Sequence, residues 1–212
     1  SHQDLYGDIK VLAGQRFPGH GAVKESFFRH QCLLFPDIVN GSIYERELIG
    51  ILSGDLRQVE KFSRAVPPER RDSVLGLIKH PFFVTRSAGS LGADVVALRG
   101  DLSAIIEVKS SINDSIMFTE ASGKRQEQAT RMIKRLEASG TFLMYAYRLK
   151  GIRSEAWTTF AAPASPKGKI AYLYDFLPKI DTTRENNFYL KWERGKPLSE
   201  FIDYMNRLQA SE

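Results

Sequence analysis

The stretch of sequence that decides the fold is residues 92–109, GADVVALRGDLSAIIEVK. It lies across two runs rich in valine, isoleucine and alanine, residues 93–98 and 103–110, and such runs predict strands. Between the runs, Arg99-Gly100-Asp101 predicts a hairpin turn. Pairing of the two strands brings the carboxylate of Asp94 to the same end of the hairpin as that of Glu107.

The residues of the second strand of this hairpin predict a functional site. Glu107 and Lys109 share one face because side chains i and i+2 point the same way, whereas Ile106 and Val108 point toward the core. Two carboxylates and a backbone carbonyl form a hard-oxygen site that suits Mg²⁺ or Mn²⁺. A lysine beside them can orient or deprotonate a water, or offset charge in a transition state. The alternative is a polar strand edge with an incidental ion pair, although charges within an apolar run are costly to bury without a partner.

The remaining sequence predicts an α/β domain in the order helix, three strands, helix, two strands. Helices are expected at residues 42–53, 55–65, 67–79, 124–139 and 198–208, and further strands at 82–86, 141–149, 156–162, 170–176 and 188–192. Trp157 and Trp192 fall on these strands and are expected in the core. The single cysteine, Cys32, excludes an internal disulfide, and no apolar run approaches the ~20 residues of a membrane span.

These motifs resemble the PD-(D/E)XK nuclease superfamily, with Ala93 at the position of the superfamily's proline. Four blocks are similar, in order, to the archaeal Holliday-junction resolvases: GSIYEREL (41–48), VTRSAGS (84–90), DVVA (94–97) and IEVKS (106–110). The resemblance covers residues 41–208 and is specific between 84 and 110. It implies a restriction-endonuclease-like α/β core, αβββαβ, whose mixed central sheet is flanked by helices. Residues 41–212 would form this nuclease domain, after a helical N-terminal extension in residues 1–40.

The resemblance also implies roles for the matching residues. Glu45, Asp94, Glu107 and the carbonyl of Val108 would bind the metal, and Lys109 would position the attacking water. The implied catalytic residues are thus Glu45, Asp94, Glu107 and Lys109. The alternative for Glu45 is a capping-box role at the third position of its helix. Glu47 is a competing acid, but it lies two residues away on a different helix face.

Other residues are expected to contact DNA. By the resemblance, Arg86 would contact a phosphate near the cut, with Ser87 and Ser90 in the adjoining loop; the alternatives are a surface arginine and turn formers. Positive charge is concentrated in residues 121–153, which carry eight Lys/Arg and two Glu, net +6, against +5 for the whole chain. This stretch is either a solvated face or a basic stripe that binds phosphates. In the second interpretation its helix contacts DNA through Lys124, Arg125, Arg131, Lys134 and Arg135.

The resemblance implies a Mg²⁺-dependent, structure-selective endodeoxyribonuclease, with Mn²⁺ as a substitute, that resolves four-way (Holliday) junctions by phosphodiester hydrolysis. The implied partners are branched or duplex DNA and a second copy of the chain, with no membrane, in a cytoplasmic, nucleoid-associated location. Two alternatives remain. One is a related nuclease of the same superfamily with another DNA substrate, restriction-like, repair-associated or virus-encoded. The other is a non-catalytic DNA-binding module.

Overall fold

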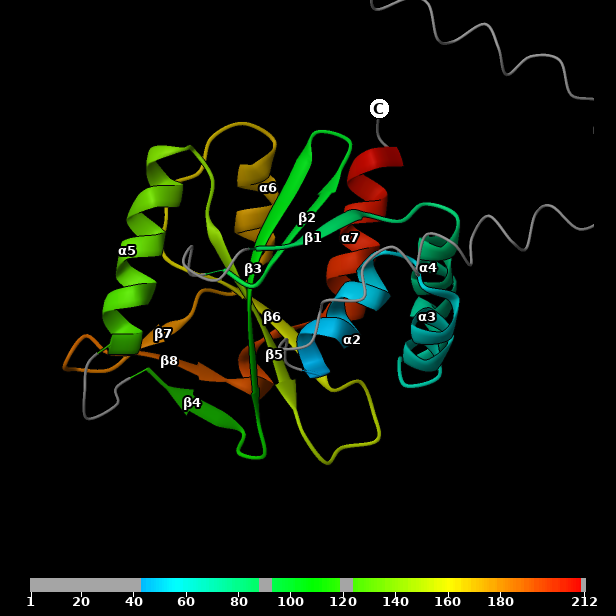
Figure 1. Cartoon of the computed structure of the whole chain (residues 1–212), viewed down its shortest axis with the longest axis horizontal. Coiled ribbons are helices and arrows are strands. Elements are labelled where there is room, and N and C mark those ends of the chain that lie inside the picture. The colour runs from blue at the N-terminus through cyan, green and yellow to red at the C-terminus, as the bar shows by residue number, and fades with distance from the viewer. Residues whose placement is uncertain (1–42, 88–92, 119–123, 211–212) are drawn as a thin grey trace, which may run out of the picture. The chain divides into compact units, whose positions relative to one another are not determined.

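The computed structural model describes residues 43–87, 93–118 and 124–210, with the backbone alone for residues 124, 125 and 210 (Figure 1). These residues belong to one compact unit, Ser42–Glu212.

The expected N-terminal extension, residues 1–40, lies outside the described residues, and its helical character stays a prediction. The unit has the expected mixed α/β fold, a central mixed sheet flanked by helices. Within the described residues, no helix has both the length and the apolar composition to cross a bilayer.

The central sheet has the strand order β1-β2-β3-β5-β6-β9. Its strands are β1 (Phe83–Arg86), β2 (Val95–Arg99), β3 (Leu102–Ser111), β5 (Leu143–Leu149), β6 (Trp157–Ala161) and β9 (Lys196–Pro197). Neighbouring strands are antiparallel except β3 and β5, which run parallel. A parallel pair needs a crossover connection, and the helix α5 (Lys124–Ala138) supplies it. The expected strand–helix order is therefore confirmed.

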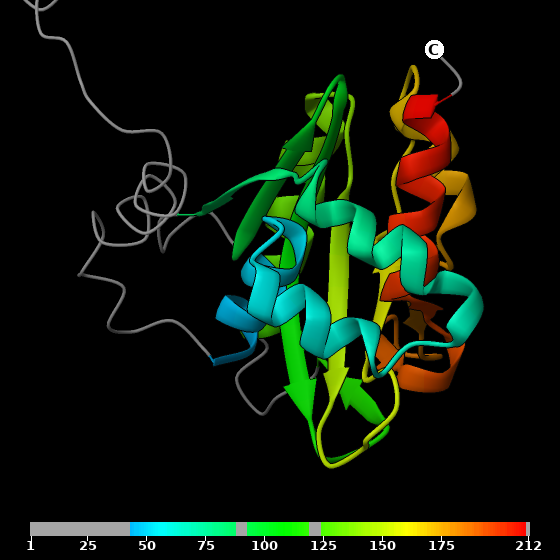
Figure 2. The ribbon, with the colours of Figure 1, turned by 90° about the vertical axis from the view of Figure 1, so that its right-hand side faces the viewer.

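Helices cover one face of the sheet, and α5 lies on the other face with a small second sheet (Figures 1 and 2). The first face carries α2 (Ile43–Leu52), α3 (Leu56–Ser63), α4 (Arg71–Leu75), α6 (Ile170–Phe176) and α7 (Leu198–Ala210). The second sheet, in the order β4-β8-β7, contains Ser115–Met117, Phe188–Lys191 and Asp181–Thr182. Strand β5 contributes side chains to the hydrophobic cores on both faces of the central sheet, because its buried side chains alternate. Met144 and Ala146 pack into the core under the helices of the first face, and Tyr145 and Tyr147 pack into the core beneath α5.

Local sequence explains the first helices. Asp55 caps α3, since its side chain accepts a hydrogen bond from the backbone N–H of Gln58 at 2.9 Å. The expected helix at residues 67–79 forms only in pieces: the 3₁₀ turn Pro68–Arg70, then α4, then the 3₁₀ turn Gly76–Ile78. The prediction of one continuous helix was therefore too long for its α-helical part.

The expected strand at residues 170–176 is wrong, because this segment is the helix α6. Leu173 is fully buried, and Ile170 and Tyr174 pack against the same core. Their spacing of three and four residues is helical, and the aromatic residues between them suggested a strand. The ring of Tyr174 meets Phe142 edge to face at 5.1 Å, which ties α6 to the start of β5.

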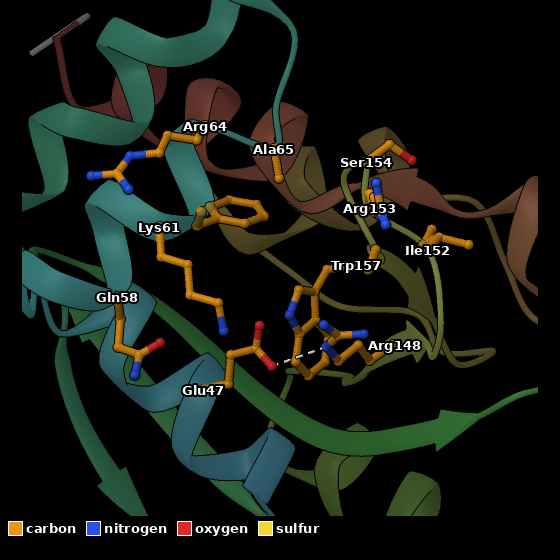
Figure 3. Close-up of a pocket in the computed structure, with 12 residues that line it drawn as sticks. Glu47, Gln58, Lys61, Arg64, Ala65, Arg148, Ile152, Arg153, Ser154 and Trp157 are labelled. Atoms are coloured by element: carbon orange, nitrogen blue, oxygen red, sulfur yellow. Dashed lines mark hydrogen bonds and ion pairs between the residues drawn. The ribbon is translucent and has the colours of Figure 1, made fainter.

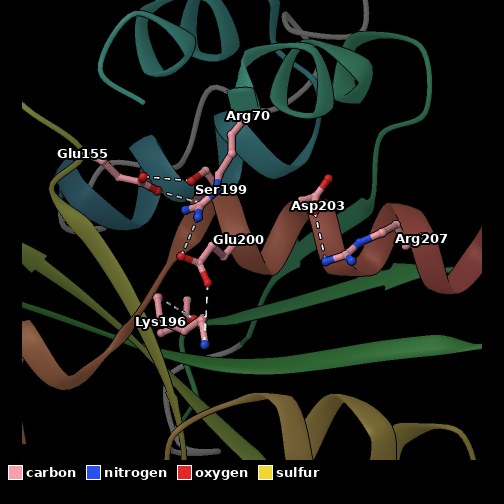
Figure 4. Close-up of polar contacts among 8 residues, drawn as sticks. Arg70, Glu155, Lys196, Ser199, Glu200, Asp203 and Arg207 are labelled. Atoms are coloured by element: carbon pink, nitrogen blue, oxygen red, sulfur yellow. Dashed lines mark hydrogen bonds and ion pairs between the residues drawn. The ribbon is translucent and has the colours of Figure 1, made fainter. Parts of the chain in front are cut away.

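A half-buried carboxylate contacts the start of α7 (Figure 4). Glu155, in the β5–β6 connection, accepts hydrogen bonds from the backbone N–H of Ser199 at 2.7 Å and from its hydroxyl at 2.8 Å. Ser199 is fully buried, and its N–H, in the first turn of α7, has no acceptor within the helix. The Glu155 carboxylate provides that acceptor. In the same network Arg70 bonds Glu200 at 2.8 Å, which links the first 3₁₀ turn to α7.

We predict that Glu155→Gln changes how stability depends on pH. Burial raises the pKa of Glu155, against the lowering effect of its hydrogen bonds to Ser199, so the folded chain holds the proton more tightly than the unfolded chain. The resulting stabilisation is complete below the unfolded pKa of about 4.3 and is lost as the pH rises through the folded pKa. In urea unfolding, the advantage of the native chain over Glu155→Gln should shrink from about pH 4 to about pH 7. An advantage that grows over this range contradicts the prediction.

Candidate functional site

The register of the β2–β3 hairpin places Asp94 beside the middle of β3. The two strands turn at Gly100, whose φ of 60° suits glycine, and Val95 pairs with Ile106. The N–H of Asp94 donates to the carbonyl of Ile106 at 2.9 Å. The Asp94 carboxylate accepts a hydrogen bond from the N–H of Val108 at 2.7 Å. The expected juxtaposition of Asp94 with the Glu107–Lys109 segment is therefore present.

Glu107 and Lys109 form an ion pair on one face of β3. The Lys109 ammonium donates to the Glu107 carboxylate at 2.7 Å, and their side chains are 25% and 13% exposed, respectively. Lys109 also lies 6.0 Å from the centre of the Phe118 ring, within cation–π range. Ile106 and Val108 pack into the opposite core, as the alternation of the strand predicts. The alternative of an exposed polar strand edge does not fit these half-buried side chains.

A third carboxylate comes from α2. The guanidinium of Arg86, on β1, donates to the Glu45 carboxylate, and the Glu45 side chain is 15% exposed. The charge of Glu45 acts on both Asp94 and Glu107, so helix α2 and the hairpin meet at one place. Glu47 points elsewhere and pairs with Arg148 at 2.9 Å. The structure thus assigns the two acids of α2 to different sites, as their positions on the helix predict.

Burial shapes the electrostatics of this acidic cluster. Burial raises the pKa of Asp94, and the charge of Glu45 adds to the increase, while the Val108 N–H and the cations Lys109 and Arg86 oppose it. Burial likewise raises the pKa of Glu107, opposed by Lys109 and reinforced by the charges of Asp94 and Glu45. The charge of Glu45 therefore makes both Asp94 and Glu107 harder to ionise, and the charge of Asp94 adds to the effect on Glu107. Groups of this kind, in mutual contact and partly desolvated, are typical of functional sites.

The donor chemistry of the cluster suits a hard divalent cation, because its ligand atoms are carboxylate oxygens that repel one another. The side-chain positions themselves do not form a metal cage: among residues 43–87, 93–118 and 124–210, no group of three or more His, Cys, Asp or Glu is arranged to hold an ion. Each of the three carboxylates instead has a partner within the protein. Glu45 faces Arg86, Asp94 faces the Val108 N–H, and Glu107 faces Lys109. Protein cations thus neutralise two of the three carboxylates.

The other residues expected to contact DNA lie at different distances from the acidic cluster, and not all of them are described. Ser87 follows β1, and its N–H donates to the carbonyl of Asp94 at 3.0 Å, which puts it next to the cluster. Ser90 lies outside the described residues. Arg131, Lys134 and Arg135 are exposed on α5. Lys124 and Arg125 begin that helix, and only their backbone is described.

The basic stretch 121–153 does not form one surface. Its first part is the helix α5, whereas Arg148, Lys150 and Arg153 lie at the end of β5 and in the connection to β6. Arg148 and Lys150 both lie over the ring of Tyr44, at 4.9 and 5.3 Å. Sequence reasoning missed this group, because Tyr44 and Arg148 are far apart in the chain and no local spacing connects them.

Comparisons with known proteins give little beyond the fold. No family model matches the chain, and no curated protein matches it. One similar solved structure is Hjc, a Holliday junction resolvase from the archaeal hyperthermophile Archaeoglobus fulgidus. It shares 22% identity with a TM-score of 0.38, over 68% of this chain and 96% of that one. A likeness of this degree assigns neither an activity nor site residues to the chain.

We predict that Glu45 and Arg86 are energetically coupled across α2 and β1. Arg86→Gln leaves a largely buried carboxylate unpaired and should lower the free energy of unfolding by about 1–2 kcal/mol. The double variant Glu45→Gln/Arg86→Gln should lose less than the two single variants together, with a coupling of about 1 kcal/mol in urea unfolding.

The exposed pair Glu60 and Arg64, 3.8 Å apart, is a matched control. Its coupling in the same cycle should be under about 0.5 kcal/mol, since surface pairs contribute little. Equal coupling for the two pairs would show that Arg86 does not hold Glu45 at the cluster.

Proposed function

We propose that this protein is a metal-dependent, structure-selective endodeoxyribonuclease that resolves four-way (Holliday) DNA junctions by phosphodiester hydrolysis. The observation that carries the proposal is the convergence of Glu45, Asp94 and Glu107 with Lys109. These side chains come from α2, from the residue just before β2 and from β3. The partial burial of Asp94 and Glu107 and their raised pKa values are costs to folding, and such costs are typical of catalytic sites.

In this proposal Glu45, Asp94, Glu107 and the carbonyl of Val108 hold Mg²⁺, for which Mn²⁺ substitutes. When bound, the cation supplies Lewis-acid stabilisation of phosphate charge and a lowered pKa for a bound water. Lys109, held by Glu107, positions the attacking water. The water oxygen forms a bond to phosphorus and gives up a proton to solvent. The phosphorus–oxygen bond to the leaving sugar breaks, and the leaving oxygen takes up a proton from solvent.

The ion pairs of the cluster have a role in the same scheme. Without a divalent cation, the carboxylates repel one another, and Arg86 and Lys109 offset that repulsion. Arg86 pairs with Glu45 and so lies beside the proposed cut site. We propose that its guanidinium would contact the phosphate that is cut.

The wider contact with DNA uses residues around the cluster. We propose that Ser87 and Ser90, and the α5 residues Lys124, Arg125, Arg131, Lys134 and Arg135, bind the phosphates of branched or duplex DNA. A homodimer would present two cutting centres related by a twofold axis, which suits paired cuts on a junction. For an enzyme that acts on chromosomal junctions, we propose a cytoplasmic, nucleoid-associated location.

A non-catalytic DNA-binding module fits the cluster less well. Three carboxylates beside DNA repel its phosphates, and a protein that only binds gains nothing from keeping them partly buried. A related nuclease with another DNA substrate uses the same cluster. The two nuclease alternatives therefore differ in substrate and not in the residues that cut.

We predict that Asp94→Asn and Glu107→Gln each lower cleavage of a labelled four-way junction in Mg²⁺ by about a hundredfold or more, since each removes a charged ligand. Binding of the same junction in EDTA should stay largely intact, because neither residue is a phosphate contact. Gel assays of cleavage and binding measure both effects.

Asp72→Asn is the matched control. Asp72 is an exposed acid in α4 whose side chain has no role in the cluster. It should cut at the native rate. Undiminished cutting by both Asp94→Asn and Glu107→Gln removes the metal site from this place.

A further inference from the structure

A pocket with charged residues in its lining lies between α2, α3 and the connection from β5 to β6 (Figure 3). Its cavity volume is about 330 Å³, and four cationic side chains and one carboxylate line it. The cations are Lys61, Arg64, Arg148 and Arg153. The carboxylate, Glu47, is engaged with Arg148 at 2.9 Å. The pocket therefore has a net positive charge, which attracts anions.

Part of this positive charge has no ion-pair partner within residues 43–87, 93–118 and 124–210. Among the described residues, neither Lys61 nor Arg153 takes part in an ion pair, and Arg64 has only the exposed contact with Glu60 at 3.8 Å. Figure 3 shows Lys61 extending from α3 toward the Glu47–Arg148 pair. Like charges gathered in a concave surface focus the potential and raise the local concentration of anions.

An unsatisfied donor in the same wall also points to a ligand. The side chain of Trp157 is 1% exposed, and within the described part of the chain its indole N–H has no hydrogen-bond partner. A buried donor without an acceptor is costly and rare. In Figure 3 the indole nitrogen lies on the side of the ring that faces Glu47 and Lys61. A ligand that brings acceptor oxygens into the pocket supplies what this donor lacks.

Helix α2 and strand β5 each carry residues near the pocket and residues near the acidic cluster. Glu45 and Glu47 are two residues apart on α2. The cations of Arg148 and Lys150 lie over the ring of Tyr44, which is on the same turn of that helix. Strand pairing sets Tyr147, the residue before Arg148, opposite Lys109. A polyanion that reaches the acidic cluster therefore has further cations close by. These come from α3 and the β5–β6 connection, outside the motifs of the cluster.

We propose that this pocket binds a phosphate group of the DNA backbone that flanks the acidic cluster. Lys61 and Arg153 supply the positive charge, and Arg148, paired with Glu47, forms part of the pocket wall. The inference rests on the proposed DNA substrate but not on cleavage. It gives a role to α3, which lies on the opposite face of the sheet from α5.

The test is the salt dependence of binding to a duplex oligonucleotide, measured in EDTA so that no cutting occurs. The variant Lys61→Gln/Arg153→Gln should lower affinity about threefold to tenfold and reduce the slope of log K against log salt by about one, as for one lost phosphate contact. The matched control is Lys167→Gln, an exposed lysine outside the pocket, which should leave the slope unchanged. An unchanged slope in the double variant overturns the proposal.

A second readout separates DNA from free phosphate. The chain has two tryptophans, so Trp192→Phe leaves Trp157 as the reporter. Its fluorescence should change on saturation with duplex and lose that response when Lys61→Gln/Arg153→Gln is added. A response to inorganic phosphate alone, with none to duplex, overturns the DNA assignment. If the duplex response is present while junction cleavage is absent, the pocket stands and the proposed nuclease function fails.

Discussion

One hydrogen bond relates the fold to the candidate site, namely that from the Val108 N–H to the Asp94 carboxylate at 2.7 Å. It exists only because the hairpin turns at Gly100 and pairs Val95 with Ile106. A shift of one residue in this register would send the alternate side chains of β3 to the wrong face. The buried Ile106 prevents such a shift. Packing of the core thus fixes the positions of the polar side chains.

The cluster built on this hairpin combines charges that oppose each other. Three carboxylates meet in a partly buried place, and two protein cations offset them. Such an arrangement contributes little to stability, because the desolvation of ion pairs consumes much of their attraction. Its persistence in a well-packed core makes sense if the carboxylates have a task outside folding. Holding a divalent cation against DNA is a task that uses both the charge and the confinement.

Sequence patterns predicted the parts of the protein in which neighbours in the chain are also neighbours in space. The hairpin, the face shared by Glu107 and Lys109, and the separation of Glu45 from Glu47 on α2 follow from strand and helix periodicity. The aromatic residues of 170–176 favour a strand, whereas packing of the buried Leu173 goes with a helix in this segment. The contact of Glu47 with Arg148, across 101 residues, and the pocket beside it depend on how α2 and α3 pack. No local pattern encodes that packing.

The most direct test of the account is a cleavage panel with the native chain. Labelled four-way junction, three-way junction, flap, plain duplex and single-stranded DNA are incubated with Mg²⁺ and, in parallel, with EDTA. The account predicts Mg²⁺-dependent cutting of the four-way junction well ahead of the plain duplex and no product in EDTA. Equal cutting of every DNA would retain the nuclease and contradict junction selectivity. No product from any of the five DNAs would contradict the central claim.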